Sequence, residues 1–483
     1  MSPNRRSVLR TGIAVTAAGA AGGVGLNIPA ATAQVETNYP NTPPGGGQFT
    51  TDPNALAAAA DDFGHFIHKT PKGVYRPTSA SDIASVVRWA KDCRLKVAAR
   101  GQGHSTFGRP MVDGGVVVDM GALAGIESAQ PDRIVVGAGA KWSAVIEAAL
   151  AQGKTPPVLT SFIELSVGGT IAVGGIGPAS HVHGMQTDNV LALEVVTGKG
   201  EVKTCSPYHN SDLFNAVRAG LGQCGIITKA TLKLIPAPAR VRRYQLFYPD
   251  VAALTADQLK VLNENRFQHI QGAFIPNGSG GWRFQLEGGV YYTDSAPDDN
   301  AVLAGLSDNR AEAVIADLSY VDYLNAFDGL ENLLRSNGQW FNPHPWWLTF
   351  LPGSSAQQTA SEILAGLTNG DLGPFGRVIY YPIKTNKFST PLLRIPNESI
   401  IFPFNLVRIP ATNDVGAAQA QVDANRALYD RILGRGGLQY PVGAIPMSCG
   451  DWRTHFGPKW TTLRNAKDRY DPTDLLTPGY EVF

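Results

Sequence analysis

Apolar positions recur every three or four residues in several stretches of the chain. Residues 82–91, 141–152 and 417–433 show this spacing, which is typical of a helix that buries one face. We therefore predict a helix over each range. The apolar positions of the first stretch are Ile83, Val86, Val87 and Ala90.

Short runs rich in β-branched residues separate these helices and predict strands. The runs lie at residues 96–100, 115–119, 133–136, 190–197, 201–204, 225–234, 284–292 and 377–382. Pro236 and Pro238 interrupt the pattern after the sixth run, which indicates a domain boundary. The mixture of strand runs and amphipathic helices after this boundary predicts a separate α+β unit.

Composition narrows the class of protein. The chain has 483 residues, of which 43% are hydrophobic and 17% are charged, so general disorder is excluded. The length suggests two or three domains. A formal net charge of +1 gives no electrostatic reason to expect nucleic acid or an anionic membrane as a partner. The 53 glycines occur in clusters, so the clusters are the place to search for chemistry.

The first 33 residues are typical of an export signal. Arg5-Arg6 precedes a weakly apolar stretch, residues 11–28, and the small-residue site Ala31-Thr32-Ala33 follows. The paired arginines favour the twin-arginine route, and we expect a periplasmic or extracellular protein. Because Pro29 interrupts a stretch rich in Gly and Ala, we expect cleavage and no membrane anchor. Residues 34–58 are predicted to form a flexible leader.

The cysteines and histidines do not predict a metal site. The four cysteines are far apart and form no C-x-x-C pair, which excludes a zinc ribbon or a thioredoxin-type motif. We expect buried free thiols, although an exported protein could form a disulfide whose partners the sequence does not give. His181-Val182-His183 lacks a third ligand at diagnostic spacing. The cysteines are Cys93, Cys205, Cys224 and Cys449.

Two glycine clusters, residues 101–105 and 167–177, could each hold a phosphate through bare backbone N–H groups. They could equally be ordinary turn-rich loops. Neither contains a dinucleotide-binding G-x-G-x-x-G, since Thr106 takes the third glycine position of the first. No phosphate-binding G-K-[ST] follows a glycine cluster either. On spacing alone, both interpretations stay open.

Several motifs, taken in order, carry a resemblance to a known family. Gly101-Gln102-Gly103-His104-Ser105 resembles the flavin-attachment loop of the vanillyl-alcohol oxidase/p-cresol methylhydroxylase superfamily, and the chain is most similar to its cytokinin dehydrogenases. The match runs from about Asp61 to Phe483. The further motifs are Val167-Gly168-Gly169-Thr170, Asp188-Asn189-Val190, residues 221–228, residues 319–325, Pro343-His344-Pro345-Trp346, Tyr470-Asp471-Pro472 and Pro478-Gly479.

The resemblance implies a two-domain α+β fold of the FAD-linked oxidase type. Residues 59–238 would form the FAD-binding domain, residues 239–438 the substrate domain, and residues 439–483 a segment that completes the FAD-binding domain. His104 stands where the family links its histidine to the 8α-methyl group of FAD. Relatives with a second, cysteine link carry it near Ile163 and Glu164, so a single covalent attachment is implied. The other implied FAD contacts are Gly101, Gln102, Gly103, Ser105, Ser166, Ile176, Ile227, Tyr440, Thr477 and Tyr480.

Two positions depart from the family at the reacting centre. The aspartate that accepts a proton from the substrate amine is replaced by Ser161, and the glutamate that grips the substrate is replaced by Gln271. A serine hydroxyl is a poor general base near neutral pH. Glu164 is a candidate replacement, although residues three apart in an extended segment face opposite sides. We treat Ser161, Glu164 and Gln271 as the candidate catalytic residues.

The resemblance predicts an exported FAD-dependent oxidoreductase that takes a hydride from an amine-type small molecule, cytokinin by family implication. Oxygen or a quinone-like compound would then accept the electrons. An oxidase of an alcohol, a sugar or a secondary metabolite is the alternative, since an uncharged site could suffice for it. A secreted flavin- or ligand-binding protein without turnover is a third possibility from a different class.

Overall fold

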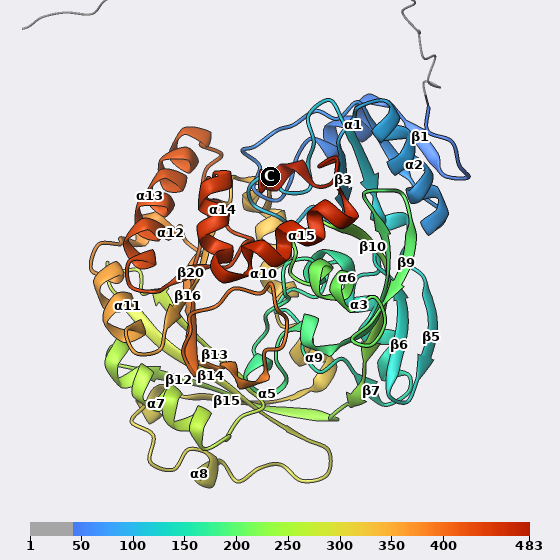
Figure 1. Cartoon of the computed structure of the whole chain (residues 1–483). Helices are drawn as coiled ribbons and strands as arrows, with labels where there is room; N and C mark the ends of the chain where they lie inside the picture. The colour runs from blue at the N-terminus through green and yellow to red at the C-terminus, as the bar shows by residue number, and fades with distance from the viewer. Residues whose placement is uncertain (1–41) are drawn as a thin grey trace, which may run out of the picture. The chain divides into compact units, whose positions relative to one another are not determined.

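Residues 42–483 are described by the structure, a computed structural model. The predicted export signal and the start of the predicted leader lie outside these residues. Four sheets and the helices that pack on them make up the described chain (Figure 1). No helix of the described part is long and apolar enough to cross a membrane.

The first sheet has four strands in the order β1-β2-β4-β3. Strands β2, β4 and β3 run parallel, and β1 is antiparallel to β2 at the edge. Helix α2 covers the expected residues because its apolar positions Ile83, Val86 and Val87 are fully buried. The elements are β1 Gln48–Thr50, α1 Pro53–Ala59, β2 Gly73–Arg76, α2 Ala80–Asp92, β3 Val97–Arg100 and β4 Val116–Asp119.

The prediction of a flexible leader is wrong for its second half. Strand β1 pairs with β2, and Gly46 donates from its backbone to Asp82 at 2.8 Å. Helix α1 then begins at Pro53, where a missing N–H costs nothing, and the Asp52 carboxylate caps its first turn. The ordered domain therefore starts about ten residues earlier than the glycine and proline content suggested.

A second, fully antiparallel sheet has five strands in the order β5-β6-β10-β8-β9. Helix α3 packs beside it through Trp142, Val145 and Ile146, which are all buried. The elements are β5 Ile126–Gln130, β6 Arg133–Gly137, α3 Trp142–Leu150, β8 Val190–Thr197, β9 Val202–Cys205, α6 Ser211–Val217 and β10 Gly225–Lys233. A two-stranded sheet lies where the chain leaves this domain. It consists of β7 Lys154–Thr155 and β11 Ile235–Pro236.

The third large sheet belongs to the predicted substrate domain and has nine strands. Its order is β15-β12-β14-β13-β17-β19-β16-β20, and β18 pairs with β19. The helices α7, α11 and α13 lie beside it (Figure 1). The strands are β12 Arg240–Tyr248, β13 His269–Pro276, β14 Trp282–Tyr292, β15 Val314–Ser319, β16 Trp347–Pro352, β17 Arg377–Tyr380, β18 Ile383–Lys384, β19 Ile400–Val407 and β20 Leu438–Gln439. The helices are α7 Val251–Asn263, α11 Ala356–Leu364 and α13 Val415–Leu433.

Short helices connect these sheets. One of them, α4, begins the glycine cluster of residues 167–177, and others contain aromatic residues. The α-helices are α4 Val167–Ile171, α5 Ser180–His183, α8 Asp299–Val302, α9 Tyr320–Leu324, α10 Asp328–Ser336 and α12 Asn369–Leu372. The 3-10 helices are η1 Met120–Ala122, η2 Gln186–Asn189, η3 Arg310–Glu312, η4 Gln339–Phe341, η5 Thr385–Lys387, η6 Gly457–Lys459 and η7 Pro478–Tyr480.

The C-terminal segment returns to the first sheet after α14, Cys449–Phe456, and α15, Trp460–Tyr470. Val97 of β3 donates its backbone N–H to Leu475 at 2.9 Å and accepts from Thr477 at 2.8 Å. Residues 475–477 therefore continue the sheet beyond β3. All four cysteines are free thiols.

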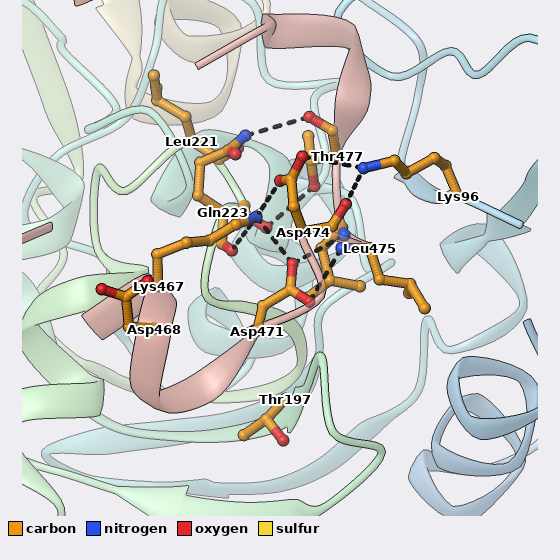
Figure 2. Close-up of polar contacts among 12 residues, drawn as sticks. Lys96, Thr197, Leu221, Gln223, Lys467, Asp468, Asp471, Asp474, Leu475 and Thr477 are labelled. Atoms are coloured by element: carbon orange, nitrogen blue, oxygen red, sulfur yellow. Dashed lines mark hydrogen bonds and ion pairs between the residues drawn. The ribbon is translucent and has the colours of Figure 1, made fainter. Parts of the chain in front are cut away.

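A buried ion pair holds this return in place (Figure 2). The Lys467 ammonium lies 2.8 Å from a carboxylate oxygen of Asp471 and 2.8 Å from one of Asp474. Asp471 is fully buried and also accepts the backbone N–H groups of Leu475, at 3.0 Å, and Leu476, at 2.9 Å. One carboxylate thus ends α15 and sets the path of the residues that reach β3.

A candidate flavin site

The loop that follows β3 opens onto a cavity of about 320 Å³. Three residues of this loop, Gln102, Gly103 and His104, line the cavity together with aromatic and charged side chains from both domains. Strands of a parallel sheet commonly place such loops at a binding site, since the loop leaves the carboxyl end of a rigid strand. The other lining residues used below are Phe63, Arg100, Lys141, Phe162, Glu164, Arg335 and Trp340.

The His104 imidazole lies among aromatic rings. It stacks on Phe63 with 4.0 Å between ring centroids, and Phe63 stacks on its other side against His344 at 4.1 Å. Phe162 lies 4.9 Å from His104. Loss of hydration, with smaller effects from nearby positive charges, lowers the pKa of His104 to about 3. The imidazole is therefore neutral at physiological pH, and a ring nitrogen is free to form a bond.

A buried aspartate fixes the shape of this loop. The carboxylate of Asp62 accepts the Ser105 hydroxyl at 2.6 Å, the Gly108 backbone N–H at 2.7 Å and the Gly64 backbone N–H at 2.9 Å. Burial raises the pKa of Asp62 to about 6, although these hydrogen bonds and Arg100 act in the opposite direction. Phe63 adds a backbone hydrogen bond to Gly103 at 2.9 Å. The segment before β2 thus anchors the attachment loop.

The glycines of the loop permit close approaches that a side chain would block. A Cβ at Gly101 would collide with the Ser166 hydroxyl, so these two predicted cofactor contacts lie directly against each other. Gly103 has a φ of +64°, and a Cβ there would collide with the Arg100 guanidinium. Ser166 precedes α4, and its hydroxyl has no hydrogen-bond partner within residues 42–483.

Backbone donors of this loop are free. In the described chain, none of the N–H groups of residues 102–106 donates a hydrogen bond to the protein. Buried or half-buried N–H groups are normally paired, so a run of free donors beside glycines and a serine hydroxyl fits a bound phosphate group. The residues present therefore fit the diphosphate of FAD, with His104 at the edge of the cavity.

The second group of predicted contacts lies around the end of the glycine cluster. The Tyr440 hydroxyl accepts the Gly175 backbone N–H at 3.1 Å, next to Ile176. The Thr477 hydroxyl donates to the carbonyl of Gly222 at 3.0 Å. These contacts bring the C-terminal segment to the end of the glycine cluster and to the loop before β10.

Two predicted contacts have mainly structural surroundings. Ile227 is buried in β10. The Tyr480 ring lies 4.9 Å from the Arg109 guanidinium, and its hydroxyl donates to the carbonyl of Pro441 at 3.3 Å. Burial raises the pKa of the Tyr480 hydroxyl, so it stays protonated. Neither residue lines the cavity at His104.

Of the three candidate catalytic residues, only Glu164 lines this cavity. Its carboxylate lies 2.8 Å from the Lys141 ammonium. Burial tends to raise the pKa of Glu164, but hydrogen bonds from Lys141 and Ser143 and the charge of Lys141 outweigh it, so the pKa is lowered. Ser161 is exposed to solvent, and Gln271 lies on β13, where it pairs across the sheet with Glu287.

The histidine pair of α5 is structural in this chain. Both ring nitrogens of His181 contact backbone carbonyls, of Pro178 and of Phe267, each at 3.0 Å. The described residues contain no group of three or more His, Cys, Asp or Glu side chains arranged to hold a metal ion.

Comparison with known families and structures agrees with this geometry. Residues 71–206 match the "FAD binding domain" family, and residues 274–483 match "Cytokinin dehydrogenase 1, FAD and cytokinin binding". The fold is similar to that of 6-hydroxy-D-nicotine oxidase from Arthrobacter nicotinovorans, with a TM-score of 0.70 and 21% identity over 89% of this chain and 96% of that chain. The predicted fold class, a two-domain FAD-linked oxidase, is confirmed.

Curated relatives are similar over most of their length. An uncharacterized oxidoreductase of the fasciation locus of Rhodococcoides fascians is 39% identical over 90% of this chain and 99% of its own. Cytokinin dehydrogenase 10 of Oryza sativa subsp. japonica is 35% identical over 90% of this chain and 88% of its own.

Fold, loop and cavity together define an FAD-dependent oxidoreductase of the two-domain FAD-linked oxidase type. Within that class, the chain belongs to the cytokinin dehydrogenase family. The family implies a small-molecule substrate and an electron acceptor.

Two residues of the site were not predicted from the sequence. Asp62 lies 43 and 46 positions before Ser105 and Gly108, the loop residues that it binds, in an unremarkable A-A-D-D-F-G segment that carries no signal of its own. His344, whose Nδ1 lies 3.0 Å from the carbonyl of Phe63, stands in the P-H-P-W motif, but that motif served only to identify the resemblance. It is the one signal that could have indicated a second histidine near His104.

Proposed function

We propose that the protein holds FAD through one covalent bond from His104 to the 8α-methyl carbon. The observation that supports this most directly is a neutral imidazole at the edge of the cavity, stacked on Phe63 and without a hydrogen-bond partner in the described chain. Bond formation releases two protons and two electrons, and the flavin itself can take up the electrons. The bond would raise the reduction potential of the flavin and favour hydride uptake.

Flavin fluorescence on a denaturing gel tests the covalent bond. Wild-type protein is expected to keep its yellow colour after acid precipitation and to give a fluorescent band. His104→Ala is expected to lose both signals, while His209→Ala, which removes an exposed histidine far along the chain, keeps them. A fluorescent His104→Ala band would contradict the proposal.

We propose further that the bound flavin accepts a hydride from a carbon next to a substrate nitrogen, with oxygen or a quinone-like compound as the final acceptor. Glu164 is the residue placed to hold the substrate amine, since its carboxylate is ionised and lines the cavity. Its lowered pKa makes it a weak base, so its role is to bind and orient the amine. Ser161 and Gln271 contribute no charge, which favours oxidation of an alcohol or sugar as the second candidate reaction.

Anaerobic bleaching of the flavin separates the two reactions. We expect amines to bleach the flavin, with isopentenyladenine among the amines tested, and alcohols and sugars to leave it oxidised. Glu164→Gln should slow bleaching by amines about tenfold or more through weaker binding. Bleaching by alcohols or sugars alone would favour the second reaction, and no bleaching by any of these compounds would favour a binding protein.

We also propose that the protein is exported by the twin-arginine route and released by cleavage after Ala33. Support comes from the sequence of the first 33 residues alone. In a bacterial host with this pathway, replacement of Arg5 and Arg6 by lysine should retain the uncleaved chain in the cytoplasm. Unchanged export of that variant would contradict the proposal.

A further inference from the structure

Arg377, at the start of β17, carries a charge without a partner. Its side chain is partly buried, and the described residues offer it neither an ion pair nor a hydrogen bond. Loss of hydration lowers the pKa of Arg377, and only the charge of Glu287 opposes this. Glu287 is itself paired with Arg243 at 2.6 Å. A guanidinium removed from water normally has an anionic partner, so one is missing.

The side chain faces away from the helices of the substrate domain. Its neighbours Val378 and Tyr380 are fully buried on the helix side, where the Tyr380 hydroxyl lies 3.1 Å from the Thr255 hydroxyl of α7. Alternation along a strand therefore places Arg377 and Ile379 on the opposite face. Gln271 and Glu287 share that face, since Gln271 pairs with Glu287 and its strand neighbour Ala273 pairs with Ile379.

This face borders the aromatic residues around His104. Arg377 pairs across the sheet with Val407, and the next residue, Arg408, accepts the Trp346 indole N–H at 2.8 Å. The Trp346 ring lies 6.0 Å from the His104 ring. Phe375, two residues before Arg377, belongs to the same aromatic cluster as Trp346. The uncompensated charge therefore lies on a sheet face next to the aromatic residues around His104.

We propose that Arg377 binds a carboxylate of the substrate, so that the substrate is an amine that also carries an acidic group. The inference rests on the proposed function, because it takes this sheet face as a wall of the substrate cavity. A guanidinium binds a carboxylate through two parallel hydrogen bonds, which fixes orientation as well as charge. Ser161 and Gln271 are neutral, and the carboxylate of Glu287 on the same sheet face is already paired with Arg243 at 2.6 Å.

Binding of benzoate and benzamide to the purified holoenzyme tests this assignment without turnover. The two probes have the same ring and differ in charge, and calorimetric titration measures the dissociation constant of each. Benzoate should bind wild-type protein about tenfold or more tightly than benzamide. Arg377→Met should remove that preference, Arg377→Lys should keep part of it, and the exposed Arg431→Met on α13 should keep all of it.

Thermal unfolding provides an independent readout. Because Arg377 has no partner in the free protein, Arg377→Met should leave the Tm unchanged or raise it, whereas loss of a structural ion pair would lower it. Benzoate should raise the Tm of the wild type and not that of Arg377→Met.

Three results would overturn the assignment. The first is that the wild type binds both probes with equal affinity. The second is that Arg377→Met loses affinity for both probes to the same extent. The third is that Arg377→Met changes the flavin reduction potential and leaves the preference for benzoate unchanged. The protein could also show a preference for benzoate that depends on Arg377 while no amine bleaches its flavin. That result would support the assignment of Arg377 and contradict the proposed reaction.

Discussion

At the scale of single residues, Asp62 does most to shape the attachment loop. Three donors converge on its buried carboxylate, and two of them, Ser105 and Gly108, flank the segment that follows His104. The backbone N–H groups of residues 102–106 donate no hydrogen bond within the described chain, so contacts from outside the loop, such as those of Asp62, hold its shape. Asp62 therefore fixes the conformation of the loop that carries His104.

Replacement of Asp62 by alanine should therefore reduce flavin attachment as well as stability. The change leaves the partly buried Ser105 hydroxyl and the buried Gly108 N–H without this partner, so we expect a loss of about 2–4 kcal/mol in the free energy of unfolding. We also expect a lower ratio of flavin absorbance to protein absorbance. Asp113→Asn, an exposed carboxylate in the same domain, is the control and should change neither quantity. Full flavin content in Asp62→Ala would show that the loop keeps its shape unaided.

The sequence predicted the loop, but not what holds it. His104 and its glycines form one short motif, so their chemistry was visible locally. Asp62 holds the loop through Ser105 and Gly108, 43 and 46 positions away, and Arg377 stands out only because it has no partner in the described chain, so neither leaves a local pattern. Residues whose role depends on long-range packing need the structure.

At the scale of elements, the three predicted helices are present, but α7, α11, α15 and the helix in the glycine cluster were not predicted. The helix expected over 82–91 is α2, Ala80–Asp92, and the one expected over 417–433 is α13, Val415–Leu433. The V-G-G segment, expected to be a loop, begins with α4. Glycine has low helix propensity, so only tertiary contacts, such as Val167 donating to the carbonyl of Ala140 at 2.9 Å, stabilise a helix there.

The end of α15 depends on a single buried ion pair. The side chain of Lys467 is 3% exposed and that of Asp471 is fully buried, so each would be costly to bury without the other. The same carboxylate binds the turn that leads residues 475–477 to β3 (Figure 2). Thr477, a predicted FAD contact, therefore depends on Asp471 for its position.

Asp471→Ala should destabilise the protein by about 2–4 kcal/mol, because it leaves the Leu475 and Leu476 N–H groups unpaired and Lys467 with Asp474 as its remaining carboxylate partner. The matched control is Asp468→Ala on the same helix, whose exposed pair with Arg464 should contribute about 0–1 kcal/mol. Urea unfolding followed by circular dichroism measures both. Equal losses for the two variants would mean that the buried pair has no special role.

At the scale of the whole molecule, buried histidines make stability depend on pH. Besides His104, the residues His269, His344 and His455 each have a pKa lowered to about 3, chiefly by burial. In the unfolded chain these groups titrate near 6.5. Between about pH 3 and pH 6.5, the unfolded state therefore binds more protons than the folded state. The contribution of these histidines to the free energy of unfolding is fully present above about pH 6.5 and is lost as the pH drops toward 3.

We expect the urea concentration at the midpoint of unfolding to decrease as the pH is lowered from about 6.5 to about 5. This range lies above the one in which carboxylates titrate. His455→Gln should flatten this fall, because His455 is buried in α14 and its Nδ1 has no partner in the described chain. His68→Gln, an exposed histidine with a side chain that is 62% exposed, should not flatten it. A midpoint that does not change from pH 7.5 to pH 5 would contradict this account.

The central claim is that His104 carries the FAD of this oxidoreductase, and the mass of the proteolytic peptide that contains His104 tests it most directly. The account predicts that this peptide from purified protein is heavier by the mass of FAD less two hydrogen atoms and that fragmentation places the added mass on His104. An unmodified His104 peptide, with the flavin recovered free in the supernatant or attached to another residue, would contradict it.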